Sequence, residues 1–163
     1  MTTLIRKFLL GMAALLLLAG NAFEARAEGG QCAPNAVKYK FSTELQETTS
    51  TAFVTVDESV ISFTVSSAPG GSCVIVTFAA EAGAEADSTM TVLAFLDGAA
   101  CSPGAVFFVR SNAVETTEAT RSMTFICHGV TPGYHVVRMK FKSSAEDKTQ
   151  QLLFRTMTVQ YLK

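Results

Sequence analysis

The sequence contains no tryptophan and only two histidines, and its one long apolar run lies near the N-terminus. Sugar-binding platforms favour the tryptophan ring, so its absence weakens a carbohydrate-binding prediction. Zinc normally takes at least three protein ligands, more than two histidines alone supply. No segment reaches the roughly 20 apolar residues that a membrane-spanning helix needs, so we expect no membrane insertion after export.

Clusters of basic residues are also absent, and the formal net charge is −1. Without a basic patch the chain has no electrostatic footprint for nucleic acid or for an anionic membrane surface. A lipid anchor is excluded as well, because Leu18-Ala19-Gly20 is followed by Asn21 and not by the cysteine that would be acylated. No cofactor motif is found, and we expect no cofactor.

Residues 1–27 have the features of a cleaved signal peptide. Arg6 and Lys7 precede an apolar run from Phe8 to Ala19, and Ala25-Arg26-Ala27 has the small residues that signal peptidase requires. Cleavage after Ala27 removes three positive charges and one negative charge, which takes the net charge from −1 to −3. We therefore expect a secreted or periplasmic protein in which residues 28–163 form a single domain.

An apolar–polar alternation with a period of two dominates the rest of the chain, as in residues 61–66. Turn residues separate the alternating segments, and Glu81–Asp87 is expected to be a loop. The sequence predicts an all-β fold, an antiparallel, jelly-roll-like β-sandwich of about eight to nine strands. The expected strands are Lys38–Leu45, Thr51–Val56, a segment from Val60, Cys73–Ala82, Thr89–Leu96, Ala105–Arg110, Arg121–Cys127, Tyr134–Lys142 and Gln151–Leu162.

All four cysteines follow the expected cleavage site, and an exported chain meets an oxidising compartment. Their spacing matches no zinc or haem motif, so two disulfide bonds are expected. If successive strands alternate in direction, Cys73, Cys101 and Cys127 lie toward the same end of the sandwich. We expect Cys101 to pair with Cys127 and Cys32 with Cys73, which is one of the three pairings that four cysteines allow.

Both histidines lie in the segment from Cys127 to Phe141, which contains the turn Pro132-Gly133. A tight hairpin about this turn would place His128 and His135 on one core-facing side, as diagonal neighbours, with Cys127 on the opposite side. A bulge would reverse that parity. The histidines are expected to close the end of the core by hydrogen bonds. His128, His135 and Tyr134 are candidate binding residues, with the metal unknown and no catalytic residue expected.

Arg138, Lys140 and Lys142 form a basic stripe on the wet side of one expected strand. An acidic ligand could use this stripe, but charged residues on the wet side of a strand usually serve solubility and discourage edge pairing. We therefore expect this stripe to be solvated.

Four segments together resemble bacterial secreted β-sandwich proteins of unassigned function. They are Val76–Ala82, Val92–Gly98, Pro132–Val137 and Arg155–Val159. The resemblance runs from about Thr51 to the end and implies a jelly-roll-like sandwich without adding a catalytic residue. The shape is similar to that of tumour-necrosis-factor and complement C1q sandwiches, which implies, by analogy of fold alone, a homo-oligomer such as a trimer.

These observations predict an exported, disulfide-stabilised, non-enzymatic protein that acts through its surface. It would be a binding module for a protein or small ligand, or an assembling subunit. The alternative is a small metal-dependent or hydrolytic enzyme that uses His128 and His135. A third hypothesis is a fimbrial subunit completed by a neighbour's strand, although Leu152–Leu162 supplies a full last strand.

Overall fold

The protein is built from ten strands in the part of the chain that its computed structural model describes, residues 32–66, 72–112 and 114–163. No helix that could span a membrane occurs in these three ranges. The expected signal peptide and the turn at Pro69–Gly71 lie outside the described residues. Every strand pairing is antiparallel, which confirms the all-β prediction.

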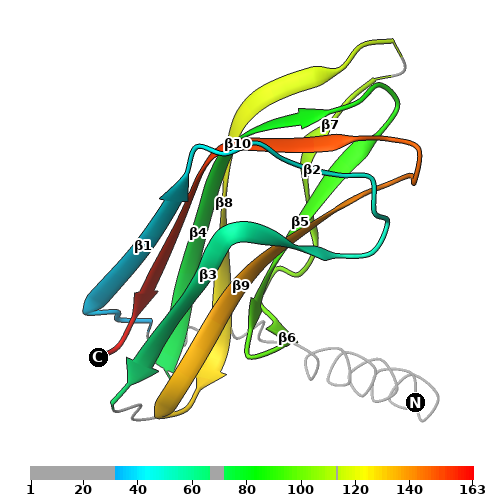
Figure 1. Cartoon of the computed structure of the whole chain (residues 1–163). Helices are drawn as coiled ribbons and strands as arrows, with labels where there is room; N and C mark the ends of the chain where they lie inside the picture. Colours follow the sequence, from blue (N-terminus) through cyan, green and yellow to red (C-terminus); the bar gives the residue numbers. More distant parts are fainter. Residues whose placement is uncertain (1–31, 67–71, 113) are drawn as a thin grey trace, which may run out of the picture.

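The first sheet, called sheet A, has the strand order β1-β10-β4-β8, and β2 also pairs with β10 (Figure 1). β1 and β2 lie one after the other along the same edge of β10, because β1 pairs with its second half and β2 with its first. The bounds are β1 Ala36–Ser42, β2 Gln46–Thr48, β4 Ser72–Ala84, β8 Thr117–Val130 and β10 Gln150–Tyr161.

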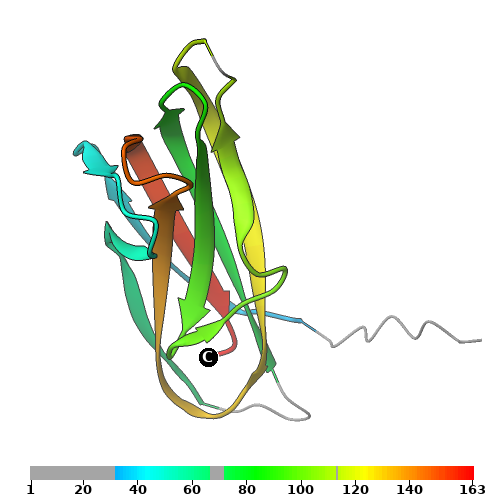
Figure 2. The same cartoon turned by 90° about the vertical axis from the view of Figure 1, so that its right-hand side faces the viewer.

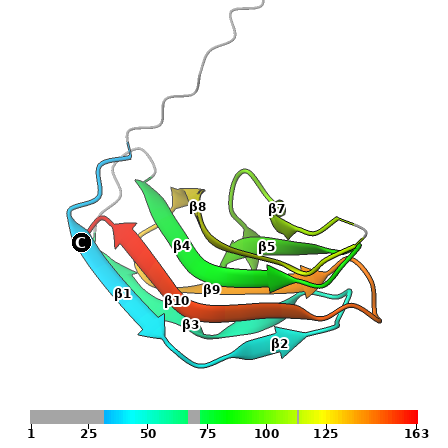
Figure 3. The same ribbon diagram turned by 90° about the horizontal axis from the view of Figure 1, so that it is seen from above.

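The second sheet, called sheet B, has the order β3-β9-β5-β6, and β7 also pairs with β5. The bounds are β3 Val54–Val65, β5 Thr89–Leu96, β6 Ala99–Ala100, β7 Val106–Arg110 and β9 Gly133–Ser143. The long strands of both sheets run along the long axis of the molecule (Figure 2). Seen from above, β1 lies on one side and β7 on the other (Figure 3).

If β1 and β2 are counted as one broken strand, and β6 and β7 as another, the two sheets have the strand order of an eight-stranded jelly roll. The core lies between the sheets and is formed by the apolar residues that alternate along the strands. Phe78 and Phe125 from sheet A and Phe63 and Phe141 from sheet B are at most 2% exposed. The sandwich prediction is therefore confirmed, together with the core positions of Val137, Met139 and Phe141.

Several strand boundaries differ from the sequence prediction. The two expected strands at Thr51–Val56 and from Val60 are one strand, β3, with a register shift between Thr55 and Val60. The expected loop at Glu81–Asp87 is wrong in its first half, because β4 continues to Ala84 and pairs with both β8 and β10. Alanine and glycine have low strand propensity, but pairing on both sides overrides it here.

The predicted hairpin at Pro132-Gly133 is wrong. β8 and β9 do not pair, because β8 belongs to sheet A and β9 to sheet B, so the turn carries the chain across the core. Gly133 has a φ of 141°, well away from the roughly +80° that a type II turn needs at this position, so the chain makes no tight hairpin turn here. The apolar residues of β8 and β9 thus enter the core from opposite sheets, as the burial of Phe125 and Val137 indicates.

The predicted outward position of Cys127 is also wrong. Cys127 is 5% exposed and lies in the core, bonded to Cys101, whereas Ile126 lies on the outer side of sheet A. Gly129 has a φ of 67°, and the pairing of β8 with β4 shifts register between Ser72 and Val74. This bulge returns Val130 to the core and produces the reversal of parity that a regular strand would not show.

Candidate functional site

The three residues predicted as a binding group lie in different surroundings. His128 is exposed on β8 beside the bulge, and Tyr134 is exposed on β9 opposite Thr64. His135 is 8% exposed, and its ring lies 5.7 Å from that of Phe63. The structure therefore does not bring the two histidines to one side of one sheet, and only His135 helps to close the core. A binding role for His128 and Tyr134 stays a prediction.

His135 is fixed by hydrogen bonds at both ring nitrogens. Its Nε2 lies 2.8 Å from the carbonyl oxygen of Thr131, and its Nδ1 lies 2.6 Å from Oδ2 of Asp97. A carbonyl only accepts, so Nε2 carries the proton of that bond. Oδ1 of Asp97 accepts a second bond, from the backbone N–H of Val136, at 2.8 Å. Asp97, in the turn after β5, thus ties this turn to the start of β9.

The ionised form of Asp97 is stabilised by these contacts. Partial burial acts to raise the pKa of this carboxyl, but the hydrogen bonds from His135 and Val136 and the charges of His135 and Arg138 outweigh it. The pKa of Asp97 therefore lies below its usual value. These contacts hold the turn after β5 against the start of β9, which is a structural role. Both ring nitrogens of His135 are already hydrogen-bonded within the protein.

A metal or thiol site is not formed by these residues. Within the described ranges, no three residues among His, Cys, Asp and Glu are grouped so that they could hold a metal ion. All four cysteines are in disulfide bonds, Cys32 with Cys73 and Cys101 with Cys127, which is the pairing expected from the sequence. The cysteines therefore act as covalent links within the sandwich.

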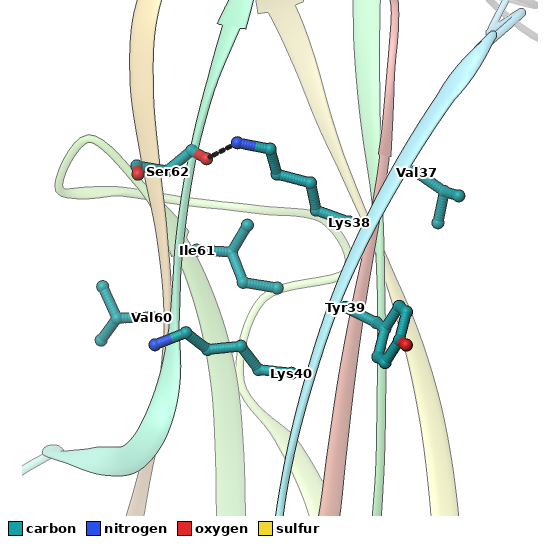
Figure 4. A pocket seen from close by; sticks show the side chains of 7 residues that line it. All are labelled: Val37, Lys38, Tyr39, Lys40, Val60, Ile61 and Ser62. Atoms are coloured by element: carbon teal, nitrogen blue, oxygen red, sulfur yellow. Dashed lines mark hydrogen bonds between the residues drawn. The ribbon is translucent and has the colours of Figure 1, made fainter.

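A groove lies elsewhere, between the edge strands of the two sheets. Four residues of β1 and three of β3 line it, and its volume is about 490 Å³ (Figure 4). β1 is the last strand of sheet A and β3 the last strand of sheet B, so neither has a further strand beyond the groove in the described chain. We call this feature the edge groove. The lining residues are Val37, Lys38, Tyr39, Lys40, Val60, Ile61 and Ser62.

Two lysines of β1 reach across the edge groove toward β3, as Figure 4 shows. Lys38 and Lys40 pair with Val159 and Met157 of β10, which are buried, so the lysines occupy positions that face the core elsewhere in sheet A. At the edge of the sheet these positions open into the groove. The side chain of Ile61 points into the same space from β3.

Among the described residues, neither ammonium group has partners for all three of its hydrogen-bond donors. Lys38 Nζ donates one bond, to the carbonyl oxygen of Ser62, at 2.7 Å. Lys40 Nζ lies 3.6 Å from Oε2 of Glu58, which is an ion pair longer than an ordinary hydrogen bond. A lysine ammonium has three donors. The groove therefore presents positive charge and free N–H groups to a ligand.

The opposite side of β1 is apolar and exposed. Val37, Tyr39 and Phe41 are 60%, 69% and 69% exposed, and they alternate with the two lysines. Val37 and Tyr39 point away from the groove in Figure 4. We call these three residues the outer row. An edge strand therefore carries a basic side and an apolar side, both open to solvent.

Arg155 holds the end of β1 in place. It is 2% exposed and donates to the carbonyl oxygens of Glu44 and Leu152 and to the hydroxyl of Ser42. Burial lowers the pKa of this guanidinium, while the charges of Asp57, Glu44 and Glu58 oppose the change. Arg155 thus anchors the segment between β1 and β2 to β10.

The edge groove was not expected from the sequence, although a strand at Lys38–Leu45 was. The segment Val37–Phe41 does contain the signal, an alternation of apolar residues with lysines. Its meaning depends on whether the strand lies at an edge or in the interior of a sheet, and strand order is not visible in a pattern with a period of two.

The fold and the edge groove define an antiparallel β-sandwich of jelly-roll order with an open, basic edge. No protein-family model and no curated protein sequence matches the chain. Among solved structures, the chain is similar to the C-terminal domain of EclA, described as a sugar-binding protein. The identity is 14% and the TM-score 0.38, over 84% of this chain and 89% of that domain.

Two further similarities are of the same low level. The CBM36-1 domain of a multidomain xylanase from the hindgut metagenome of Trinervitermes trinervoides is 8% identical over 75% of this chain and 96% of that chain, with a TM-score of 0.39. The VP2 protein of infectious bursal disease virus is 10% identical over 80% of this chain, with a TM-score of 0.44. The present chain spans 34% of that capsid chain. Scores of this size carry no argument about what the protein binds.

Proposed function

We propose that this protein is an exported, non-enzymatic binding module that holds an extended anionic ligand in the edge groove. The observation that carries the proposal is the pair Lys38 and Lys40, which point into the groove from an edge strand and keep unused donors. Hydrogen bonds from an ammonium to an anion are among the stronger polar contacts in proteins. The site therefore selects negative charge.

The shape of the groove supports an extended ligand. Its walls are two strands, and it follows four consecutive residues of β1 and three of β3. Ile61 lines the groove on the β3 side but is 4% exposed and belongs to the core, so the groove offers a ligand the exposed ammonium groups of the two lysines. A ligand with charges spaced along a chain would contact both ammonium groups, whereas a compact anion would contact one.

A purely structural role for the two lysines predicts a different result. Inward-pointing charged residues protect the edge of a sheet from unwanted strand pairing, and Lys38 and Lys40 are placed to do this. Protection of the edge requires no ligand. Binding measurements on the lysine variants separate the two roles.

The test uses the purified exported protein and two short polyanions, a polyglutamate peptide and an oligogalacturonate. Amide chemical shifts of β1 and β3 are followed by NMR at low and at physiological ionic strength. We expect at least one polyanion to shift amides along the groove, and Lys38→Ala with Lys40→Ala to weaken its binding by about tenfold or more.

The matched control replaces Lys140 and Lys142, two lysines with the same spacing on the outer side of β9. Lys140→Ala with Lys142→Ala removes the same charge and should change the affinity by less than about threefold. If both double variants lost the same affinity for the polyanion, the binding would be general charge attraction and not a property of the edge groove. No shift along β1 and β3 with either polyanion would contradict the proposal.

Two disulfide bonds fit an oxidising compartment, so the ligand would be met outside the cytoplasm. The export itself is tested by the N-terminal sequence of the protein recovered from the periplasm or medium. We expect it to begin at Glu28, and a chain that still begins at Met1 would contradict cleavage.

A further inference from the structure

The free edge of β1 is a site for backbone pairing. All seven residues of β1 pair with β10, and no strand in the described part of the chain pairs with its other edge. At such an edge, alternate residues present unpaired N–H and C=O groups, which a further strand can satisfy. β1 has seven residues, and a paired strand has the same rise per residue, so β1 could accept an extended segment of about six residues.

The two sides of β1 specify which residues such a segment would carry. Side chains that lie opposite one another in neighbouring strands are about 5 Å apart and interact directly. A strand added to β1 would place alternate side chains beside Lys38 and Lys40 in the groove, and the others beside the outer row. Acidic residues complement the first set and apolar residues the second.

We propose that the ligand of the edge groove is an extended peptide that adds to β1 as a further strand of sheet A, with acidic and apolar residues in alternation. Its acidic side chains bind Lys38 and Lys40, and its apolar side chains pack against Val37, Tyr39 and Phe41. The inference rests on the proposed function and assigns the ligand to a class.

The geometry favours β1 over β3 as the pairing strand. The carbonyl oxygen of Ser62, which points toward the groove, already accepts a bond from Lys38. β3 is also interrupted by the register shift between Thr55 and Val60, with Glu58 at a φ of 56°. β1 pairs without a shift along its whole length, so its free edge is continuous.

A second copy of this chain is a poorer occupant. If β1 paired with β1 of another molecule, with the core-facing sides of both sheets aligned, the lysines of the two strands would lie side by side. Like charges placed opposite one another destabilise a strand pair. The same lysines that reject a copy would accept an acidic strand, which is how repulsive contacts give specificity.

The test compares three end-blocked peptides of six residues with the same exported protein. The first alternates valine and glutamate. The second has the same composition with the three valines before the three glutamates. The third is the alternating peptide with every backbone nitrogen methylated, so that neither of its edges can donate a hydrogen bond to β1. Affinity is measured by calorimetry, and the pairing by amide hydrogen exchange of β1.

We expect the alternating peptide to bind at least about tenfold more tightly than the other two, and to slow the exchange of free-edge amides in β1. Tyr39→Ser with Phe41→Ser should lower the affinity for this peptide by about fivefold or more but leave the affinity for polyglutamate unchanged. Phe107→Ser is the matched control, because Phe107 is 78% exposed on β7, and it should have no effect.

Each other outcome decides a different question. Equal affinity for the first two peptides would overturn strand addition and leave anion binding in the groove intact. Equal affinity for the first and third would show that backbone pairing contributes nothing, which also overturns the inference. Failure of every peptide and both polyanions would overturn the proposed function as well. Protection of β1 that increases with protein concentration alone would assign the edge to a second copy.

Discussion

Strands β1 and β9 each carry two lysines separated by one residue, yet the pairs differ in every contact. Lys140 and Lys142 point outward from β9, which has neighbours on both sides, and lie 4.8 Å and 5.2 Å from the ring centroids of Phe95 and Phe53. Lys38 and Lys40 point inward from an edge strand and lie beside backbone oxygen and carboxylate. The position of the strand, and not the residue pattern, decides what a lysine pair contacts.

The anchoring of the two strands differs as well. β9 is paired on both sides, and its start is tied to the turn after β5 by Asp97 and His135. In the described part of the chain β1 is paired on one side, and its end is held by the bonds that Arg155 donates to Ser42 and Glu44. β1 should therefore open locally more easily than β9, which is a property of binding segments in many proteins.

The largest expected effect comes from Arg155. Arg155→Met should lower the free energy of unfolding by about 3 kcal/mol, because the buried oxygens that accept its bonds lose their donor. Urea unfolding measures the loss. Amide exchange should become faster in β1 than in β9.

Arg121, an exposed arginine of β8, offers the matched control for this change. Arg121→Met should leave stability within about 0.5 kcal/mol of the wild type. If Arg155→Met were equally harmless, or accelerated exchange in β1 and β9 alike, the distinct anchoring of β1 would be refuted.

A smaller effect is expected at the other anchor. Asp97→Asn should cost about 1 kcal/mol, because the charge-assisted contact with His135 is weakened while an oxygen remains to accept from Val136. The pKa of Asp97 is lowered in the folded state, so its contribution is present above the usual value of 3.8 and is lost as the pH falls through the lower, folded value.

The pH dependence makes this prediction specific. The free energy of unfolding, measured with urea, should fall more between pH 6 and pH 3 for the wild type than for Asp97→Asn. Parallel curves for the two proteins would show that the ionised carboxyl contributes nothing to the start of β9.

The smallest effect on stability is expected for the lysine pair of β1, and it should differ from that of the lysine pair of β9. Lys140→Ala with Lys142→Ala should cost about 1 kcal/mol, since each ammonium lies over a phenylalanine ring. Lys38→Ala with Lys40→Ala should change stability by less than about 0.5 kcal/mol, because the polar contacts that the two ammonium groups make in the wild type are exposed to solvent. Thermal unfolding of both variants tests whether the β9 pair contributes more to stability than the β1 pair. For ligand binding the expected order is the reverse. A larger loss for the β1 pair would favour a structural role at the edge.

The sequence predicted the elements of this fold well because local rules determine them. Alternation located the long strands, and turn residues marked most of their ends. Strand directions placed Cys73, Cys101 and Cys127 toward one end of the sandwich, and the expected pairing, Cys101 with Cys127 and Cys32 with Cys73, is the one that the structure has. The core positions of Val137, Met139 and Phe141 followed from the same alternation.

The predictions about the site were less accurate because they depended on pairing between strands. Pro132-Gly133 was expected to join two strands of one sheet, but it connects the two sheets. The bulge at Gly129 then moved Cys127 into the core and left His128 in solvent. Both events depend on contacts between residues far apart in the chain, which a local pattern does not record.

The sequence by itself determined that this chain forms a sandwich of antiparallel strands, because burial of alternate apolar side chains is a property of each strand alone. Only the tertiary structure decided that β1 and β3 are edges in the described part of the chain, and that Lys38 and Lys40 of β1 face β3 of sheet B across a groove. Strand order follows from the packing of two whole sheets, and the same two lysines in an interior strand would have no groove to enter.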